Sequence, residues 1–304
     1  MLDVHRLRIL LAVVESGSVT AAAEQLGYSP SAVSQQLRRL EREAGQPLLQ
    51  RHARGMVPTD AGTVLASHAR KVVRQLSAAE ADLREIAGLR RGRLDFGTFP
   101  TVGSSFVPIA VRRFRELHPF VTLTIRSERE DALIAMLEDG RVGLSLLWDY
   151  EWDRLDARRF ALRTLFDDPT VLVVGADHPL ARRREVALGQ LAEQSWIIRA
   201  NDHPVVEVLR RSALAAGFEP RISFEANDYQ EAQAMVSVGL GVALAPRTAV
   251  VNKHPRVRIL SLGDSVPARR ILLAQRHDRV RAPAEMGFGE VLLEVARTYV
   301  PGDL

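Results

Sequence analysis

Polar side chains along one predicted helix have the types and spacing needed to read the edges of nucleic-acid bases. Within residues 30–43, Val33, Leu37 and Leu40 fall at helical spacing and predict a buried face. We assign the reading surface on the other face to Ser29, Ser31, Ser34, Gln35 and Arg38. Arginine and glutamine can each form two hydrogen bonds to one base in the major groove of DNA, and serine can form one. This face therefore predicts contact with DNA bases.

A shorter helix precedes the reading helix and would pack across it. Its apolar residues, between positions 19 and 26, recur at i, i+3, i+4 and i+7, and Gly27 ends it. Pro30 suits the first turn of the reading helix, where a missing N–H costs nothing. A further amphipathic helix over residues 4–15 completes a small core. The three helices predict a helix-turn-helix unit whose core fixes the angle of the reading helix.

A basic turn follows these helices. Arg51, His52 and Arg54 flank Gly55, and we predict a β-hairpin wing in which Arg51 and Arg54 contact DNA phosphates. The alternative is an ordinary solvated basic loop. Residues 1–92 hold 13 Lys and Arg against 9 Asp and Glu, and the totals of 41 and 37 leave 28 of each sign for residues 93–304. A basic module on a neutral body favours nucleic acid as the partner of the first part.

A long helix is expected from Asp60 to Ala87, with no glycine or proline after Gly62. Apolar residues step along it by four and three positions, which is the a/d spacing of a coiled coil. The residues that we assign to this dimerisation seam are Leu65, Ala69, Val72, Leu76 and Leu83. A single apolar stripe favours pairing with a second copy of the chain. The alternative is that the same stripe packs against the chain's own body.

Beyond residue 92, short β-rich runs alternate with helical stretches. Strands are expected at 94–98, 121–126, 142–147, 170–174, 196–199, 222–226, 242–245 and 270–275, and helices at 105–117, 131–138, 205–215, 229–238 and 285–299. The βαβαβ order predicts parallel sheets covered by helices on both faces, repeated in two lobes. Residues 88–92 contain two glycines and two arginines and are expected to form a hinge before the first strand.

The N-terminal residues, taken in order, resemble the winged helix-turn-helix of LysR-type transcriptional regulators. The resemblance rests on A-V-V-E at 12–15, T-x-A-A-x-x-L at 20–26, S-x-S-A-V-S at 29–34 and T-x-A-G at 59–62. Pro30 stands where many members carry a glutamine, and Leu49 stands where phenylalanine is usual. The absence of that glutamine shifts the expected base contacts to Ser31, Ser34, Gln35 and Arg38.

The C-terminal part resembles the effector domain of the same family, which is built like a type 2 periplasmic binding protein. Gly97-Thr98, L-x-x-G-R at 137–141, H-P-L at 178–180 and G-x-G-x-x-L-x-P at 239–246 carry this resemblance, whereas Gly143 replaces an acidic residue that is usual there. The implied fold is α/β: a winged helix-turn-helix at 1–59, a dimerisation linker helix at 60–89 and a two-lobed, doubly wound effector-binding domain at 93–304. Lobe I is expected at about 93–164 and 268–304, and lobe II at about 165–267.

The ends of the predicted strands supply polar and aromatic side chains suited to a small molecule. Ligands of open α/β sheets bind where strand C-termini and helix N-termini meet. The effector residues that we predict there are Pro100, Thr101, Ser104, Trp148, Asp149, Arg199, Asn201, Asn227 and Asp228. Arg199 is suited to hold a carboxylate with two hydrogen bonds. For each residue taken alone, a helix cap or a solvated loop position is the competing interpretation.

Enzyme, metal and membrane interpretations find little support. The chain has no cysteine, and its eight histidines are never closer than 16 positions, so no local metal pair or thiol site is expected. No Walker lysine, G-x-S-x-G elbow or complete dinucleotide loop occurs, and no cofactor is expected. No apolar run reaches the length of a membrane span. A triad assembled from distant residues is not excluded by these patterns.

The resemblance implies a transcription regulator that binds an inverted-repeat operator as a dimer or tetramer. A small-molecule effector bound between the lobes would change the DNA contacts and the contact with RNA polymerase. A bacterial cytoplasmic, nucleoid-associated location follows from this interpretation. The alternative is a cytoplasmic small-molecule sensor that acts through a protein partner without sequence-specific DNA binding.

Overall fold

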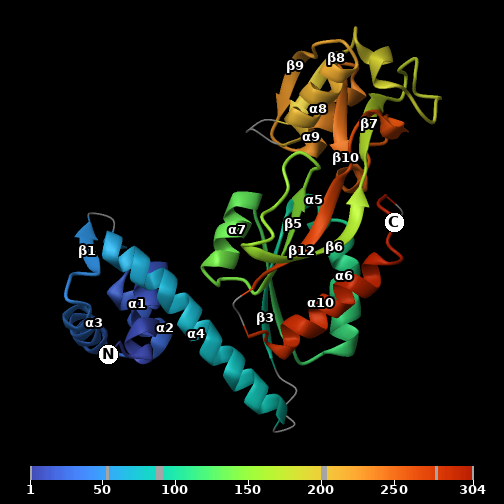
Figure 1. The fold of residues 1–304 in the computed structure, drawn as a ribbon. Helices are drawn as coiled ribbons and strands as arrows, with labels where there is room; N and C mark the ends of the chain where they lie inside the picture. The colour runs from blue at the N-terminus through green and yellow to red at the C-terminus, as the bar shows by residue number, and fades with distance from the viewer. Residues whose placement is uncertain (1, 53–54, 87–91, 200–203, 278–279, 303–304) are drawn as a thin grey trace.

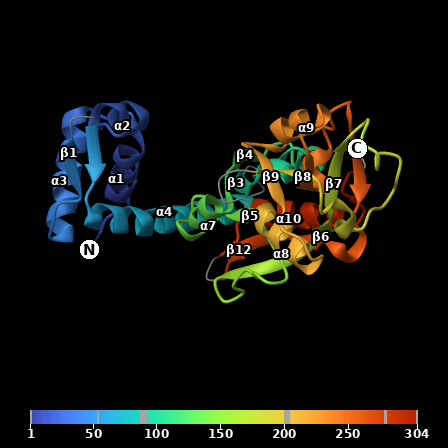
Figure 2. The ribbon, with the colours of Figure 1, turned by 90° about the horizontal axis from the view of Figure 1, so that it is seen from above.

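The chain forms an N-terminal helical module, a long helix and two α/β lobes. The computed structural model describes residues 2–52, 55–86, 92–199, 204–277 and 280–302. In Figure 1 the long helix α4 leads away from the N-terminal module, and the two lobes are stacked one above the other. Seen from above, α4 runs from the module at one end toward α7 in the lobes (Figure 2). Within the described residues, no helix is long and apolar enough to cross a membrane.

Three helices and a hairpin build the N-terminal module. The helices are α1 (Val4–Ser16), α2 (Val19–Leu26) and α3 (Pro30–Ala44), and β1 (Leu49–His52) pairs antiparallel with β2 (Gly55–Pro58). The side chains of Ser18 and Ser29 cap α2 and α3 by accepting from backbone N–H groups. A left-handed glycine ends both helices, as Gly27 was expected to do. The predicted winged helix-turn-helix is confirmed.

The linker helix α4 (Asp60–Ile86) has 27 residues and a length of about 40 Å. Its first turns complete the core of the N-terminal module, where Ala66 and Ala69 are buried together with residues of α1, α2 and α3. Its later turns extend past this core toward the lobes. One helix therefore belongs to two parts of the molecule.

Lobe I is built on a five-stranded sheet in the order β4-β3-β5-β12-β6. The strands are β3 (Arg93–Thr98), β4 (Thr122–Ser127), β5 (Leu144–Asp149), β6 (Phe160–Asp168) and β12 (Arg269–Arg276). The helices are α5 (Pro100–Gly103), α6 (Phe106–Leu117), α7 (Glu130–Glu138) and α10 (Pro283–Ala296). Phe288 of α10 packs edge-on against Phe96 and Phe114, with ring centroids 4.9 and 5.0 Å away. These rings fix α6 and α10 on the sheet.

Lobe II repeats this plan with the strand order β11-β7-β10-β8-β9. The strands are β7 (Thr170–Gly175), β8 (Ser195–Arg199), β9 (Arg221–Ala226), β10 (Val242–Pro246) and β11 (Val257–Ser261). The helices are α8 (Pro204–Ala215) and α9 (Tyr229–Ser237), with short 3-10 turns η1 (Leu188–Leu191), η2 (Arg247–Val250) and η3 (Gly263–Ser265). The chain crosses between the lobes after β6 and again before β12.

The two lobes are confirmed, but the expectation of wholly parallel sheets was wrong. β12 runs antiparallel to β5 and β6, and β7 runs antiparallel to β10 and β11. The strands β6 and β11 were also missed. Both lie at sheet edges, and exposed arginines such as Arg163 and Arg258 interrupt their apolar runs. The antiparallel pairs of β12 arise because the chain re-enters the first sheet after building the second.

Candidate DNA-reading surface and interlobe site

The predicted reading surface lies on the exposed face of α3. Ser29 Oγ accepts from the Ala32 N–H at 3.2 Å and lies 3.0 Å from Ser31 Oγ, and Ser34 Oγ donates to the Pro30 carbonyl at 2.9 Å. The serines are thus engaged in local hydrogen bonds. Gln35 and Arg38 are exposed, and their side chains have no hydrogen bond or ion pair to the described residues. Of the predicted reading residues, Gln35 and Arg38 are thus the two whose side chains have no described partner.

The wing is fixed to the helical core by a close backbone contact. The Met56 N–H donates to the Gly17 carbonyl at 2.8 Å. A Cβ on Gly55 would lie 2.5 Å from that carbonyl oxygen, so only glycine allows this approach. Arg51 lies opposite Met56 on the hairpin and is exposed. Arg54, the second predicted phosphate contact, lies outside the described residues.

The structure divides the predicted dimerisation seam into two parts. Leu65 and Ala69 pack into the core of the N-terminal module, as the alternative interpretation proposed for the whole stripe. Val72, Leu76 and Leu83 have exposed fractions of 41%, 40% and 65%. The part of the predicted seam that remains exposed therefore lies in the distal half of α4.

Between the lobes, the centre of the described site is a buried arginine that the sequence did not reveal. Arg269, at the start of β12, is 1% exposed, and its guanidinium pairs with Asp168 at 2.8 Å. It also donates to Thr101 Oγ1 at 2.6 Å and to Thr248 Oγ1 at 3.0 Å. Phe99 lies 5.1 Å from this charge. Burial is the largest single influence and opposes the charge, but attraction to Asp168, Tyr150 and Tyr229 together with the hydrogen bond to Asp168 outweighs it and raises the pKa of Arg269.

This network brings two predicted effector residues together and ties the lobes to each other. Thr101 comes from α5 in lobe I, and Thr248 comes from η2 in lobe II. Trp148 lies beside them, with its ring 5.8 Å from the Arg269 guanidinium. A separate contact joins the lobes where Arg211 of α8 lies 5.2 Å above the Trp152 ring. The Arg269 network, this cation–π contact and an apolar cluster shared by both lobes therefore join lobe I to lobe II.

Other residues predicted for lobe I are placed differently. Asp149 is buried, and its carboxylate accepts hydrogen bonds from Arg270 at 2.7 and 2.8 Å and from Arg154 at 2.9 Å. Burial opposes its ionisation, but these hydrogen bonds outweigh burial and lower the pKa of Asp149. Pro100 and Ser104 line a separate surface pocket beside Thr98 and Ser127.

In lobe II, three predicted residues meet at the start of α9. Arg199 lies 5.3 Å from the centre of the Tyr229 ring and donates to the Asn227 carbonyl at 3.2 Å. Asp228 caps α9 by accepting from two backbone N–H groups, and Asn227 bonds to Glu231. Asp228 thus has the helix-cap role that was its competing interpretation, whereas the Arg199 side chain remains partly exposed. Asn201 lies outside the described residues.

Glu130, at the start of α7, is a half-buried acid near this junction. Burial raises the pKa of Glu130 to about 8, although its carboxylate accepts from the Trp148 N–H at 3.4 Å. The neutral carboxyl can donate a hydrogen bond at neutral pH. Neither Glu130 nor the Arg269–Asp168 pair could be found from spacing. The pair is separated by 101 positions, and no local pattern marks it.

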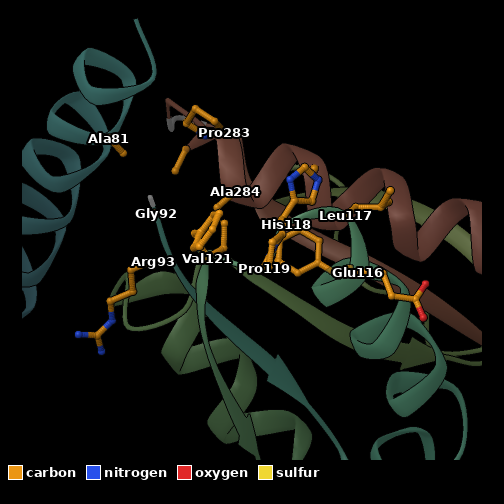
Figure 3. Close-up of a pocket in the computed structure, with 14 residues that line it drawn as sticks. Ala81, Gly92, Arg93, Glu116, Leu117, His118, Pro119, Val121, Pro283 and Ala284 are labelled. Carbon is orange, nitrogen blue, oxygen red and sulfur yellow. The ribbon is translucent and has the colours of Figure 1, made fainter. Parts of the chain in front are cut away.

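A mainly apolar pocket of about 500 Å³ lies elsewhere, at the lower end of lobe I. Figure 3 shows the end of α6 and the following turn on one side, the start of α10 above and Ala81 of α4 opposite. His118, Pro119, Val121 and Ala284 are among the residues that line it. None of the predicted effector residues lies in this pocket. Among the described residues, no group of three His, Cys, Asp or Glu side chains is placed to hold a metal ion.

A winged helix-turn-helix joined to a two-lobed α/β domain defines a DNA-binding transcription regulator with a ligand-binding domain. Residues 4–63 match the family model "Bacterial regulatory helix-turn-helix protein, lysR family", and residues 87–297 match the "LysR substrate binding domain". The chain belongs to the LysR family of regulators. It is therefore not an enzyme, and a sensor without DNA binding is not favoured.

Similar proteins support this assignment over nearly the whole chain. The chain is 30% identical over 302 residues to the HTH-type transcriptional regulator CbbR of Rhizobium meliloti (strain 1021), covering 98% of this chain and 94% of that protein. A full-length OxyR variant from Pseudomonas aeruginosa has a similar fold, with a TM-score of 0.77 at 22% identity and coverage of 98% and 95%. Full-length CbnR in complex with its target DNA is also similar in fold, with a TM-score of 0.57 at 22% identity and coverage of 97% and 100%.

Proposed function

We propose that this regulator reads an inverted-repeat operator as a dimer, with one α3 helix in each major groove. Gln35 and Arg38 would contact base edges, since they are exposed and free of described partners, and Arg51 and Arg54 would contact phosphates. Val72, Leu76 and Leu83 would join the two copies along distal α4. Two dimers would form the tetramer that acts with RNA polymerase in the bacterial cytoplasm, at the nucleoid.

The effector would bind at the interlobe junction and change the DNA contacts. The observation that carries this proposal is the Arg269 network, because the same guanidinium donates to Thr101 of lobe I and Thr248 of lobe II. A ligand that inserts beside these groups would favour one lobe arrangement over another, which is the only way it can shift the equilibrium. Thr101, Trp148 and Arg199 would contact the ligand once it has entered the junction, and Asn227 would lie beside Arg199. Asn201, which lies outside the described residues, stays a predicted contact on the strength of its position in the sequence.

Arg199 and Glu130 indicate the chemistry of the effector. A carboxylate would pair with the Arg199 guanidinium, and a neutral Glu130 would donate a hydrogen bond to an acceptor oxygen. Both features favour a small organic acid. These 304 residues contain no cysteine, so they offer no thiol for a redox signal.

Selection of bound DNA from a random pool tests the proposal. The intact protein should enrich a two-fold symmetric sequence, because two reading helices are related by the dimer axis. The double variant Val72→Glu, Leu76→Glu should retain the fold, since both residues are exposed, but should sediment as a monomer and enrich only a single half-site. Enrichment of the same symmetric sequence by both proteins would reject distal α4 as the seam. The absence of any enriched sequence would reject sequence-specific DNA reading.

A further inference from the structure

The linker helix α4 is docked onto lobe I of its own chain by polar contacts. Ser67 Oγ donates to Asp139 Oδ1 at 3.1 Å. Seven residues further along the helix, Arg74 Nη2 donates to Glu285 Oε1 at 3.0 Å, and Arg74 Nη1 donates to the Gly140 carbonyl. The three lobe residues come from the end of α7 and the start of α10, which lie far apart in sequence.

The acid that receives Arg74 is built into lobe I and is not a mobile surface side chain. Glu285 is 4% exposed. Its second oxygen, Oε2, accepts from the Ala282 N–H at 3.1 Å and so caps the start of α10. The Arg74 side chain is itself only 16% exposed. A pair held in this way is screened less by salt than a surface pair and is more strongly oriented.

Gly143 makes the space for this contact, and Gly140 forms the turn beside it. A Cβ at position 143 would overlap both Glu285 Oε1 and Arg74 Nη2, so any other residue at Gly143 would force the pair apart. Gly140 has a left-handed φ of +71°, and a Cβ there would touch Lys71 and Arg74 of α4. Gly143, which stands where the family usually has an acidic residue, therefore has a physical reason here. The negative charge comes from Glu285, on another segment, and Gly143 leaves room for it.

The docked face of α4 is opposite to the face proposed for dimerisation. Ser67, Arg74 and the buried Ala78 follow one another at steps of seven and four positions and share one side of the helix. Val72 and Leu76 each lie two positions from Arg74, which places them about 160° around the helix axis. Docking on lobe I and pairing with a second copy therefore do not compete for the same surface.

We propose that Ser67, Arg74, Asp139, Gly140, Gly143 and Glu285 form a linker latch that fixes the angle between the reading head and lobe I. While the latch is closed, the N-terminal module, α4 and lobe I move as one body. The step that re-angles the reading heads is then the opening of the latch, a two-state contact of the kind that switching requires. The latch would be the step by which the proposed regulator changes its DNA contacts. It rests on the proposed function only in the experiments that measure DNA binding.

The absence of native cysteine allows the latch to be trapped directly. The variant Ser67→Cys, Asp139→Cys places two thiols where the native side chains touch, and mild oxidation should give a disulfide within one chain. On a non-reducing gel this product runs as a monomer of changed mobility. The matched control is His68→Cys, Asp139→Cys, since His68 is the next residue but is exposed on a different side of the helix. The control should not form the disulfide within the chain.

Variants of the latch should lower the yield of this disulfide by about tenfold, which corresponds to the loss of one hydrogen bond to a charged group. In the double-cysteine background, Gly143→Ala should have this effect through overlap, and Glu285→Gln should have it through loss of charge without a change of shape. Gly189→Ala is the matched glycine control, because a Cβ there meets nothing closer than 3.9 Å. Thermal unfolding checks that each variant folds.

The outcomes separate the latch from the proposed function. Equal disulfide yields in the test and control pairs, or a disulfide only between chains, would overturn the latch without reference to DNA. With the latch trapped, affinity for the selected two-site operator should differ by about tenfold from that of the Gly143→Ala variant, whereas affinity for a half-site should be equal. Equal affinity of the trapped and opened proteins for the two-site operator would overturn its regulatory role. Loss of all DNA binding with normal trapping would instead reject the proposed function.

Discussion

The reading head and the interlobe junction use polar residues in opposite ways. On α3, Gln35 and Arg38 project into solvent from a core made by neighbouring turns of the chain. At the junction, Arg269 and Asp168 are buried and satisfied by each other and by threonines from both lobes. The polar residues on α3 can be replaced without loss of stability, whereas those at the junction cannot. Substitutions should therefore separate recognition from stability in the head but not at the junction.

The largest expected effect follows from removing the buried charge. Arg269→Met leaves Asp168 buried without its cation, and breaking a buried pair in this way costs about 3–5 kcal/mol of unfolding free energy. Chemical unfolding of the full chain measures the change. The matched control is Arg163→Met, which breaks an exposed pair with Glu290 and should cost less than about 1 kcal/mol. Similar losses for the two variants would contradict the contrast between buried and exposed charge.

Glu130 should make the stability of the junction depend on pH. Its pKa rises from 4.5 to about 8 on folding, so the folded state holds a proton that the unfolded state releases. Stability from this group is therefore complete below the unfolded pKa and is lost as pH rises through the folded pKa. The variant Glu130→Gln should remove this loss. The unfolding free energy of the variant minus that of the parent should therefore increase as the pH rises from about 5 to about 8. Parallel stability curves over this range would reject the protonated acid.

Smaller effects, without change of stability, are expected on the reading head. Gln35→Ala should weaken binding by about 1–3 kcal/mol, chiefly at one base position of the selected operator. Arg51→Ala should weaken all sequences alike and lower the slope of affinity against salt by about 1. Binding titrations on the selected operator and on single-base variants, at several salt concentrations, measure both. Identical profiles for the two variants would contradict the division into base and phosphate contacts.

Much of the fold could be predicted because local spacing determined it. The boundaries of α2 and α3 follow from their serine caps and terminal glycines, and the two lobes follow from alternating strands and helices. The antiparallel strands could not be predicted, since strand direction in β12 depends on where the chain re-enters lobe I. Among the residues predicted for the effector site, Thr101 and Trp148 lie beside Arg269, a group that the sequence did not single out.

The linker helix shows most clearly which features the sequence determined and which the tertiary structure determined. The sequence by itself determined that residues 60–86 form an amphipathic helix, because helix formation depends on neighbours three and four positions away. Only the tertiary structure decided what each face contacts. Leu65 and Ala69 belong to the reading head, Val72 and Leu76 remain open, and Arg74 is bound by Glu285, 211 positions away. Contacts over such separations depend on the folded path of the whole chain, which no local spacing records.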